Sequence, residues 1–349
     1  MKKILFVIDD ITKKGGTERI TITLAEKLML HGIPCEIFSL NKENKESFYE
    51  VSNVKIIYGV NKSSLCSKIS AIKYAKLNNL IMVVVSMGRL SLEMVLLARL
   101  ALFKEIYCYE HVSFESFSII IQKLKLFAYK FSKGVVFLTQ NDVTYVKNKI
   151  RKAKICAIDN ISPYENYVID SSITKKNIVL AIGRFTYQKN FERLISLWCQ
   201  LPDLCWKLQI IGDGENKESL RALISKNKIN NIEIIPSTNR IEEYYSASKI
   251  LVMTSRYEGL PMVLIESLNF GIPAIAFDCK TGPREIIQNN ITGYVIAEDD
   301  DKDFIYKLQT LMNEPEKLYQ MSINAKKYSS RFTFQNVKSQ WVEFLELKE

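Results

Sequence analysis

The chain has 349 residues, of which 47% are hydrophobic and 25% are charged, a balance that excludes a disordered protein and is typical of soluble globular ones. At roughly 150 residues per domain, this length favours two domains. No apolar run approaches the roughly 20 residues that span a bilayer. We expect no signal peptide either, because Asp9 and Asp10 end the first apolar run, residues 4–8.

The formal net charge is +10, and all of the excess lies in the first half of the chain. Residues 1–165 contain 25 Lys and Arg against 15 Asp and Glu, whereas residues 166–349 contain 23 of each. This asymmetry indicates that the first half meets nucleic acid, a membrane surface or a phosphorylated substrate. The seven cysteines form no C-x-x-C pair, so we expect reduced structural thiols in a cytoplasmic protein and no zinc site.

Short apolar runs alternate with helical patterns along the first half. The run 4–8 precedes an amphipathic helix within residues 15–31, which Gly32 closes in the C′ position. Further strands are expected at residues 34–40, 54–59, 81–87, 105–112 and 134–139. Because strands alternate with helices, we predict a doubly wound parallel sheet.

The aperiodic stretch 163–176 predicts a linker, after which the pattern starts again. Strands are expected at residues 177–183, 206–215, 231–237, 249–255 and 272–278. We therefore predict two Rossmann-like α/β domains, 1–165 and 166–330, with residues 331–349 as a C-terminal helix that packs back on the first. A ligand then belongs in the cleft at the carboxyl ends of the strands. The acidic run 298–303 is expected to be a solvated loop rather than a metal site.

Glycines stand at two predicted strand ends. Gly15 and Gly16 open the first helix, where the missing Cβ lets backbone N–H groups approach a phosphate, and a flexible loop is the alternative. The pattern differs from the G-x-G-x-x-G of dinucleotide binders. Gly212 and Gly214 follow a strand of the second domain, where a tight turn explains them equally well.

Cations and a histidine stand at two further strand ends. Arg184 follows the strand 177–183, and Lys189 comes five residues later. Such a pair suits a diphosphate, with Arg bidentate and Lys a point charge, although two solvated surface charges are an equal alternative. His111 follows Glu110 at another strand end, and a core position and a site position are equal alternatives for it.

Two carboxylates flank the apolar run 260–265. Glu258 precedes this run in a loop, and Glu266 comes eight residues later. Pro261 fits the first turn of a helix and Gly271 fits its end, so Glu266 belongs to the second turn. A carboxylate among apolar faces must be paired or bonded to a ligand. Sugar hydroxyls are apt partners, and a structural ion pair is the alternative.

At these motifs the chain resembles a known family, the retaining GT-B-fold glycosyltransferases of family 4. The resemblance covers most of the second half, through "IGRFTYQKN", "LQIIGDGE" and "EGLPMVLIESLNFGIPAIAFDCKTGPREII", and the spacing of its two glutamates is highly specific. The first half matches more loosely, through "GGTER", "EH" and "FLTQND". Pro236 and Ser237 stand where the family often has a glycine, which obscures base recognition.

The resemblance implies roles for the candidates. Arg184 and Lys189 would bind the donor diphosphate and stabilise the departing nucleotide, in place of a metal. Glu258 would contact the transferred sugar, His111 would lie beside that sugar, and Glu266 would bind the ribose hydroxyls. The implied catalytic residues are Arg184, Lys189, Glu258 and His111, and the implied donor-binding residues are Gly15, Gly16, Arg184, Lys189, Gly212, Glu258, Gly259, Leu260, Met262, Val263 and Glu266. No metal and no cofactor are expected.

The reaction implied is the transfer of a hexose or N-acetylhexosamine from a nucleoside-diphosphate sugar, with UDP as the expected nucleotide. Retention would follow from front-face attack, in which the donor phosphate accepts the acceptor's proton. Two alternatives stay open. A nucleotide-sugar epimerase on the same fold needs carboxylates aimed at the sugar ring, for which Glu110 and Asp10 are loose candidates. A nucleic-acid-binding protein would explain the charge, but it predicts interleaved aromatic and basic residues that are not evident.

Two basic amphipathic stretches, 61–77 and 120–133, lie in the half that would bind the acceptor. In the second, Leu124, Phe127 and Phe131 share one helical face. A core-facing helix with solvated lysines is the alternative for either stretch, but together they predict docking on an anionic membrane. We therefore expect a cytoplasmic enzyme, peripheral at the inner face of the cell membrane, that extends a lipid-linked, polyprenyl-diphosphate oligosaccharide for a bacterial surface polysaccharide. A lipid-A core is the nearest rival acceptor, and no nucleic-acid partner is expected.

Overall fold

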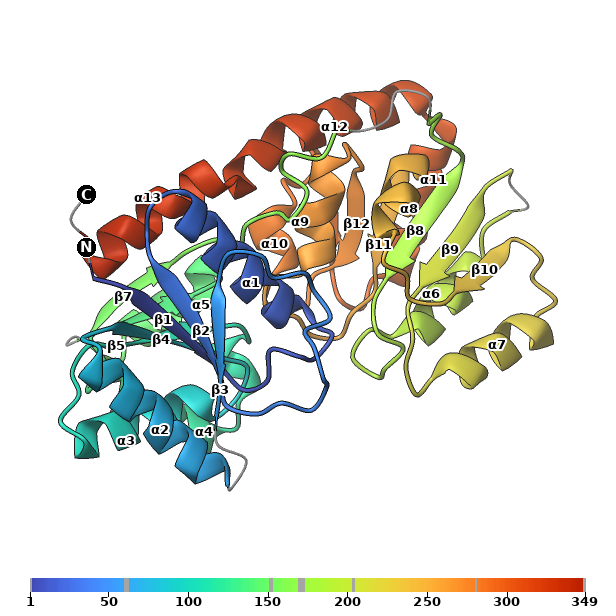
Figure 1. Cartoon of the computed structure of the whole chain (residues 1–349). Helices are drawn as coiled ribbons and strands as arrows, with labels where there is room; N and C mark the ends of the chain where they lie inside the picture. Colours follow the sequence, from blue (N-terminus) through green and yellow to red (C-terminus); the bar gives the residue numbers. More distant parts are fainter. Residues whose placement is uncertain are drawn as a thin grey trace. The chain divides into compact units, whose positions relative to one another are not determined.

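The computed structural model describes residues 2–59, 63–150, 153–168, 173–202, 205–279 and 281–347. The chain divides into two compact units, Met1–Pro163 with Phe332–Glu349, and Tyr164–Arg331. Each unit is a parallel sheet covered by helices on both faces (Figure 1). The predicted fold class, two doubly wound α/β domains, is therefore confirmed. Among the described helices, none combines the length and the apolarity needed to cross a bilayer.

The first unit is built on a seven-stranded sheet in the order β3-β2-β1-β4-β5-β6-β7. Its strands are β1 (Ile4–Ile8), β2 (Cys35–Ser39), β3 (Lys55–Tyr58), β4 (Ile81–Ser86), β5 (Ile106–Glu110), β6 (Gly134–Phe137) and β7 (Lys154–Ala157). Its helices are α1 (Gly16–Leu30), α2 (Ser64–Leu77), α3 (Leu90–Leu100), η1 (Phe114–Ser116), α4 (Ile119–Tyr129), α5 (Gln140–Lys147) and α13 (Phe334–Leu345). The first six strands were predicted, whereas β7 was not.

The central strands β1, β4 and β5 are buried along their whole length, as continuous apolar runs require when helices cover both faces of a parallel sheet. Helices α2, α3 and α4 form one layer on this sheet, with α3 in contact with both neighbours (Figure 1). Helix α1 ends as predicted, because Gly32 adopts a φ of +77° just beyond it, a conformation that costs glycine little.

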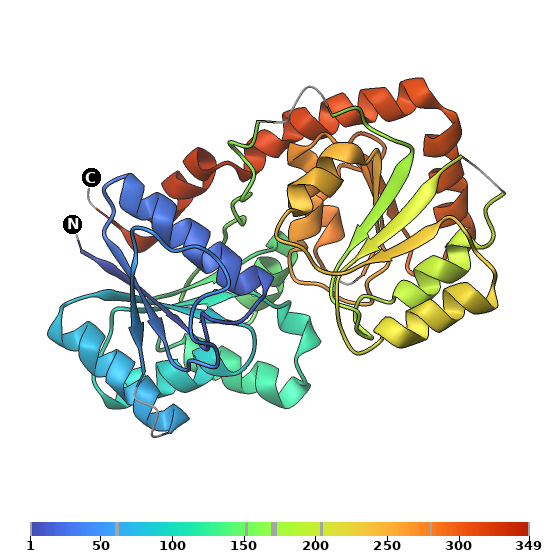
Figure 2. The ribbon, with the colours of Figure 1, turned by 45° about the vertical axis from the view of Figure 1, so that its right-hand side comes forward.

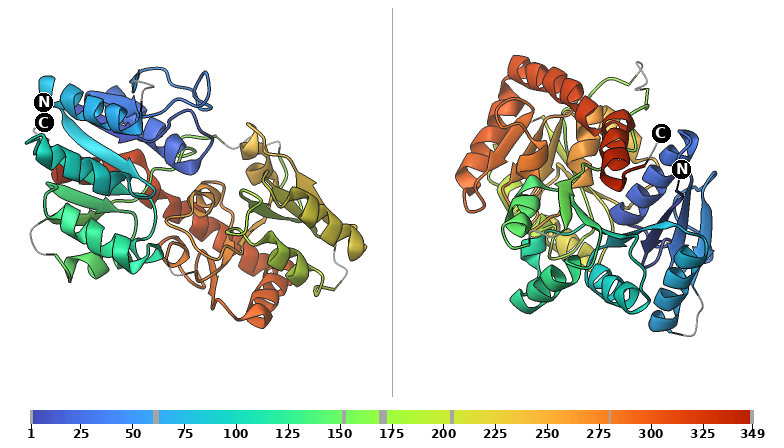
Figure 3. Two further views of the ribbon diagram at one scale, coloured as in Figure 1. Left: turned by 90° about the horizontal axis from the view of Figure 1, so that it is seen from below. Right: turned by 90° about the vertical axis from the view of Figure 1, so that its left-hand side faces the viewer.

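The last helix of the chain, α13, packs on α1 of the first unit (Figure 3). Its Trp341 is fully buried and lies edge-on to Phe6 of β1 and Tyr109 of β5, with ring centroids 6.4 Å and 5.0 Å apart. Phe344 packs in the same way on Tyr107, at 5.5 Å. Large aromatic side chains dominate the energetics of such packing, so residues from both ends of the chain pack together on this face of the sheet.

The second unit is built on a six-stranded parallel sheet in the order β10-β9-β8-β11-β12-β13. Its strands are β8 (Ile178–Ile182), β9 (Lys207–Ile211), β10 (Ile232–Ile235), β11 (Ile250–Met253), β12 (Ala274–Phe277) and β13 (Gly293–Ile296). Its helices are α6 (Phe191–Trp198), α7 (Lys217–Lys226), α8 (Ile241–Ala247), α9 (Met262–Asn269), α10 (Pro283–Ile286), α11 (Asp301–Asn313), α12 (Pro315–Tyr328) and η2 (Ser329–Phe332). Helices α6 and α7 cover one face, and α8 and α9 the other (Figure 2).

The acidic run was predicted to be a solvated loop, and this is wrong for its second half. Asp300 is the N-cap of α11, where its carboxylate accepts a hydrogen bond of 2.9 Å from the backbone N–H of Asp303. Asp301 pairs with Arg193 at 2.6 Å. Carboxylates at this position satisfy the exposed N–H groups and the positive end of the helix dipole, so the run serves as a helix start.

Candidate functional site

Three of the predicted site residues lie at the carboxyl ends of β8 and β11, neighbours in the second sheet. Arg184 and Lys189 follow β8, and Glu258 follows β11. The structure brings two of them into direct contact, because Lys189 Nζ lies 2.5 Å from Glu258 Oε1. Both side chains are largely buried, with 16% and 9% of their surfaces exposed. Lys189 is therefore not the solvated surface charge of the alternative reading.

Hydrogen bonds hold the two loops that carry these residues together. Thr254 Oγ1 donates to the backbone carbonyls of Lys189 and Asn190, at 3.2 Å and 3.1 Å. In the other direction, the Gln188 side chain donates to the carbonyl of Tyr257 at 2.9 Å. Such supporting contacts fix functional side chains on a rigid scaffold. Sequence reasoning missed Thr254 and Gln188, which belong to no spacing pattern.

Arg184 differs from Lys189 in being exposed. Its side chain forms no hydrogen bond or ion pair with any residue that the structure describes. The next residue, Phe185, is fully buried and anchors the loop. An exposed guanidinium in the same loop as Lys189 suits an anion, because arginine binds a phosphate through two parallel hydrogen bonds.

Gly212 and Gly214 follow β9, and the packing of their neighbours explains both. A Cβ atom at Gly212 would collide with the carbonyl oxygen of Gly183 and lie 2.9 Å from the Phe185 ring. Gly214 has a φ of +153°, and a Cβ there would lie 2.5 Å from the Phe185 carbonyl oxygen. These glycines let the β9 loop pack against the loop that carries Arg184, which supports the structural alternative for them.

Glu266 lies in the second turn of α9, as predicted, and is 5% exposed. Its Oε2 accepts a hydrogen bond of 2.7 Å from the hydroxyl of Tyr245. Tyr245 is fully buried and stacks on Phe270, with centroids 5.1 Å apart. The sequence predicted a ligand or an ion pair, and a buried tyrosine was not foreseen. Pro261 lies one residue further out than predicted, at the N-cap of α9.

Contacts from the β12–α10 loop hold the chain between the two glutamates. Thr281 Oγ1 donates to the carbonyl of Glu258 at 2.7 Å. Gly282, with a φ of +103°, packs directly against the carbonyl of Gly259. Beyond these contacts, Leu260 is buried, and Met262 and Val263 are half-buried in the first turn of α9.

In the first unit, α1 begins at Gly16, with Gly15 as an extended N-cap that has no side-chain hydrogen bond. The carboxylate of Glu18 lies where a Cβ at Gly15 would be. An acidic side chain in the first turn of a helix complements its dipole. A phosphate bound at this helix start would therefore have to compete with Glu18.

His111 follows β5 and is 8% exposed. Its backbone N–H donates to the carbonyl of Ser86, at the end of β4, at 2.8 Å, and its ring lies 4.2 Å from that of Tyr109. Burial lowers the pKa of His111 to about 3, so the imidazole is neutral near pH 7. Its Nε2 is buried without a hydrogen-bond partner among the described residues. An unsatisfied buried polar atom costs about 1–3 kcal/mol, so a ligand hydroxyl would be a favourable partner.

The two carboxylates that an epimerase would use are engaged within the first unit. Glu110 pairs with Lys125 at 2.9 Å and accepts a hydrogen bond from the Tyr129 hydroxyl at 2.8 Å. Asp10 accepts hydrogen bonds of 2.8 Å and 2.6 Å from the backbone N–H and the hydroxyl of Thr12. Each therefore has a structural role, which removes the support that the epimerase alternative had.

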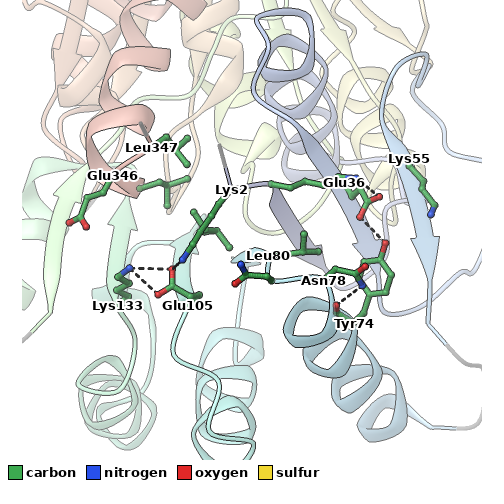
Figure 4. A pocket seen from close by; sticks show the side chains of 14 residues that line it. Lys2, Glu36, Lys55, Tyr74, Asn78, Leu80, Glu105, Lys133, Glu346 and Leu347 are labelled. Atoms are coloured by element: carbon green, nitrogen blue, oxygen red, sulfur yellow. Dashed lines mark hydrogen bonds and ion pairs between the residues drawn. The ribbon is translucent and has the colours of Figure 1, made fainter. Parts of the chain in front are cut away.

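A cavity of about 910 Å³ lies at the opposite, amino ends of the first unit's strands (Figure 4). Its charged side chains mostly pair with one another: Lys3 with Glu36 at 2.6 Å, and Lys133 with Glu105 at 3.0 Å. Because these pairs satisfy the charges, and no buried side chain among the described residues that line the cavity lacks a hydrogen-bond partner, it is not a candidate site.

Comparison with known proteins identifies the fold. The structure matches the Anabaena Alr3699/HepE protein in complex with UDP and glucose with a TM-score of 0.85 and 17% identity, covering 99% of this chain and 100% of that one. It matches Staphylococcus aureus TarM in complex with UDP with a TM-score of 0.83 and 16% identity, covering 99% and 100%. The fold is therefore the GT-B fold of glycosyltransferases.

The family follows from sequence. Residues 165–328 match the model of the glycosyl transferases group 1. The chain is 42% identical over 322 residues to the amylovoran biosynthesis glycosyltransferase AmsD of Erwinia amylovora, covering 89% of this chain and 90% of that one. It is 25% identical over 360 residues to a Campylobacter jejuni α-1,4-N-acetyl-D-galactosaminyltransferase, named for an acceptor on PP-undecaprenol, covering 99% and 98%. The chain belongs to the group 1 glycosyltransferases, as its motifs indicated.

Proposed function

We propose that this glycosyltransferase is a retaining, metal-independent enzyme that moves a hexose or N-acetylhexosamine from a UDP-sugar to a lipid-linked saccharide in cell-surface polysaccharide biosynthesis. The observation that carries the proposal is that Arg184, exposed and without a side-chain partner among the described residues, follows β8 in the same loop as Lys189, which pairs with Glu258 at the carboxyl ends of β8 and β11. Two cations here suit the charge that develops on the diphosphate as the sugar leaves, and fixed charges of this kind supply much of an enzyme's rate enhancement.

The donor assignment draws on neighbours of the same fold, two of which are described in complex with UDP. In our proposal Glu266 binds the ribose hydroxyls, while Glu258 and the buried His111 contact the sugar. Gly15, Gly16, Gly212 and the segment from Gly259 to Val263 would complete the donor site. The uncharged imidazole of His111 suits a sugar hydroxyl, because it can donate or accept one hydrogen bond without the desolvation cost of a charge.

Donor specificity and metal independence can be tested together. The protein should transfer label from one of UDP-glucose, UDP-galactose or their N-acetylated forms to saccharides in a bacterial lipid extract, and the new bond should keep the donor's anomeric configuration. Because Arg184 and Lys189 supply the charge, EDTA should leave the rate unchanged. Activity that EDTA abolishes and manganese restores would reject the metal-free mechanism, and an inverted anomer would reject retention.

Replacing Glu266 with Gln should weaken UDP binding. A charged acceptor for two ribose hydroxyls becomes an amide, and losing hydrogen bonds to a charged group costs roughly 1.5–3 kcal/mol, or about 10- to 150-fold in affinity. Calorimetric titration with UDP measures this. Tyr245→Phe is the control, because it removes the hydroxyl bonded to Glu266 and keeps the charge. A Glu266→Gln variant that melts lower but binds UDP as tightly as the wild type would make Glu266 purely structural.

The acceptor assignment draws on the relatives. One is named for amylovoran biosynthesis and another for an acceptor on PP-undecaprenol. Together with the basic first half of this chain, they support a polyprenyl-diphosphate saccharide as the acceptor, held at the inner face of the cell membrane. A lipid-A core remains the rival acceptor, and the lipid fraction that takes up the label distinguishes the two.

The layer formed by α2, α3 and α4 supports contact with an anionic bilayer. Large apolar side chains on and beside these helices are exposed rather than packed: Leu65, Ile69, Leu77, Leu100, Leu102, Ile119, Ile120, Leu124 and Phe127. Residues 63–133 contain ten lysines and arginines against four acids. Exposed apolar groups among basic ones are typical of surfaces that dock on anionic membranes. Residues 61 and 62 of the first predicted stretch lie outside the described residues.

Sedimentation with vesicles tests this surface. Binding should require anionic lipid and fall with salt. Lys123 and Lys130 of the predicted stretch are exposed, and each basic residue near such a surface contributes about 1 kcal/mol. Changing both to Glu should therefore weaken binding by about thirty-fold or more. Lys125 does not belong in this test, because it is buried.

The matched control changes two exposed lysines of the second unit, Lys226 and Lys228, to Glu, and it should bind like the wild type. Equal recovery of the wild type with neutral and anionic vesicles, at any salt concentration, would reject the membrane proposal. A control that binds as weakly as the Lys123 and Lys130 variant would assign the effect to net charge alone.

A further inference from the structure

A fully buried ion pair lies next to His111. Lys125 of α4 and Glu110 of β5 are 0% and 1% exposed, and their charged atoms are 2.9 Å apart. Lys125 lies in the basic stretch 120–133, whose lysines were expected to face an anionic membrane, and for Lys125 this is wrong. The lysine points inward from α4, while Leu124 and Phe127 of the same helix are exposed.

Lys125 has three partners from three different segments. Besides Glu110, its Nζ donates to the carbonyl of Gly88 at 2.6 Å and lies 4.2 Å from the centre of the Phe117 ring. Glu110 is satisfied on its other side by the Tyr129 hydroxyl. A buried charge is tolerated only when hydrogen bonds of this kind complete its shell.

These contacts join the elements that carry His111. Gly88 lies in the loop after β4, and Ser86, the last residue of β4, accepts the backbone N–H of His111. Glu110 is the last residue of β5 and the covalent neighbour of His111. One ammonium group therefore fixes the ends of two adjacent strands at the point where His111 emerges.

We propose that Lys125 and Glu110 are positioning residues, which hold His111 and the Ser86–Gly88 loop in the geometry that transfer requires. The inference rests on the proposed role of His111 beside the sugar. The physical argument comes from the free energy that burying this ion pair costs. Replacing a buried ion pair by well-packed apolar residues is often neutral or even stabilising. A pair kept for stability alone would thus be a poor choice, whereas the directional bonds of an ammonium group define one geometry for three segments.

The test separates stability from position. In the double variant Glu110→Leu with Lys125→Met both charges are replaced by apolar side chains, so no uncompensated charge is left in the core. We expect only a modest fall in melting temperature, because the Tyr129 hydroxyl and the Gly88 carbonyl lose their partners. We also expect a fall in kcat of about ten-fold or more and an unchanged KM for the UDP-sugar. The control, Glu36→Leu with Lys3→Met, removes another ion pair of the first unit, at the amino ends of its strands, and should leave kcat unchanged.

A second readout does not depend on activity. The chain has two histidines, so the imidazole signals of His31 and His111 can be told apart by NMR. In the wild type the His111 signal should not titrate between pH 5 and 8, because burial lowers the pKa of His111 to about 3. In the double variant the loosened His111 should gain solvent and titrate near its ordinary pKa of about 6.5. A wild-type His111 signal together with wild-type kcat in the double variant would overturn the proposal.

Should the double variant fail to fold, Tyr129→Phe decides the matter. It removes one hydroxyl bonded to Glu110 and no charge, and it should shift the His111 resonances and lower kcat in the same direction by a smaller factor. If neither changes, the pair does not position His111. Failure of the proposed function looks different: the wild type itself would then bind no UDP and transfer no sugar, while the His111 titration would still report on the pair.

Discussion

Replacing Arg184 with Ala should lower the turnover of sugar transfer by about 100- to 1,000-fold, the loss typical when one preorganised donor to a developing negative charge is removed. Stability should not change, because the exposed side chain of Arg184 has no partner among the described residues and surface substitutions away from special features usually stay within about 0.5 kcal/mol. Steady-state kinetics and thermal melting of the same preparation measure both quantities.

The matched control is Arg221→Ala. Arg221 is a half-exposed arginine of the same unit, on α7, where it pairs with Glu218 at 2.9 Å, and its loss should leave kcat unchanged. Arg184→Lys should recover only part of the activity, because a lysine keeps the charge but cannot bind a phosphate through two parallel hydrogen bonds. Full activity of Arg184→Ala at an unchanged melting temperature would show that the diphosphate lies elsewhere.

Gly212→Ala should destabilise the second unit by about 3 kcal/mol, at the upper end of what overpacking usually costs. The new methyl group would meet a backbone carbonyl, that of Gly183, which cannot rotate away as a flexible side chain could. The strand ends must move apart instead, and this displaces the loop that begins with Arg184. We therefore expect Gly212→Ala to lower both the melting temperature and kcat.

Gly88→Ala is the control for this substitution. A Cβ atom there has no atom within 4 Å and the backbone needs no positive φ, so stability should be unchanged. Hydrogen exchange locates the effect of Gly212→Ala, which should appear in β8 and β9 and not in the first unit. If Gly212→Ala melts like the wild type, the two loops can separate at little cost. The close approach to Gly183 would then not be the reason for a glycine at this position.

The main lines of the fold could be predicted because long apolar runs and glycine-ended helices depend on local chemistry. The strands that were missed, β7 and β13, are no shorter than β3 and β6, which were predicted, so length alone does not explain the miss. The acidic run was misread because whether a carboxylate is solvated or caps a helix depends on the backbone that follows it.

The candidate residues could be found from their places at strand ends, but their partners could not. Lys189 and Glu258 were each assigned to a ligand, and the structure pairs them with each other. Lys125 fits the helical pattern of a solvated lysine, yet it is buried because Glu110, fifteen residues earlier in the chain, needs a counter-charge. Such pairings depend on which elements become neighbours in three dimensions, and a single sequence does not encode that in any short motif.

The return of α13 to the first unit has a consequence for how the protein is made. Domains generally fold in the order in which the ribosome produces them, but here Trp341, at the centre of the first unit's core, is synthesised only after the whole of the second unit. Until α13 is synthesised, the side chains of Phe6 and Tyr109 that Trp341 covers are therefore exposed, although Tyr164–Arg331 has already been made. A nascent chain that stalls before residue 334 would leave these side chains exposed, and it would be a natural client for chaperones.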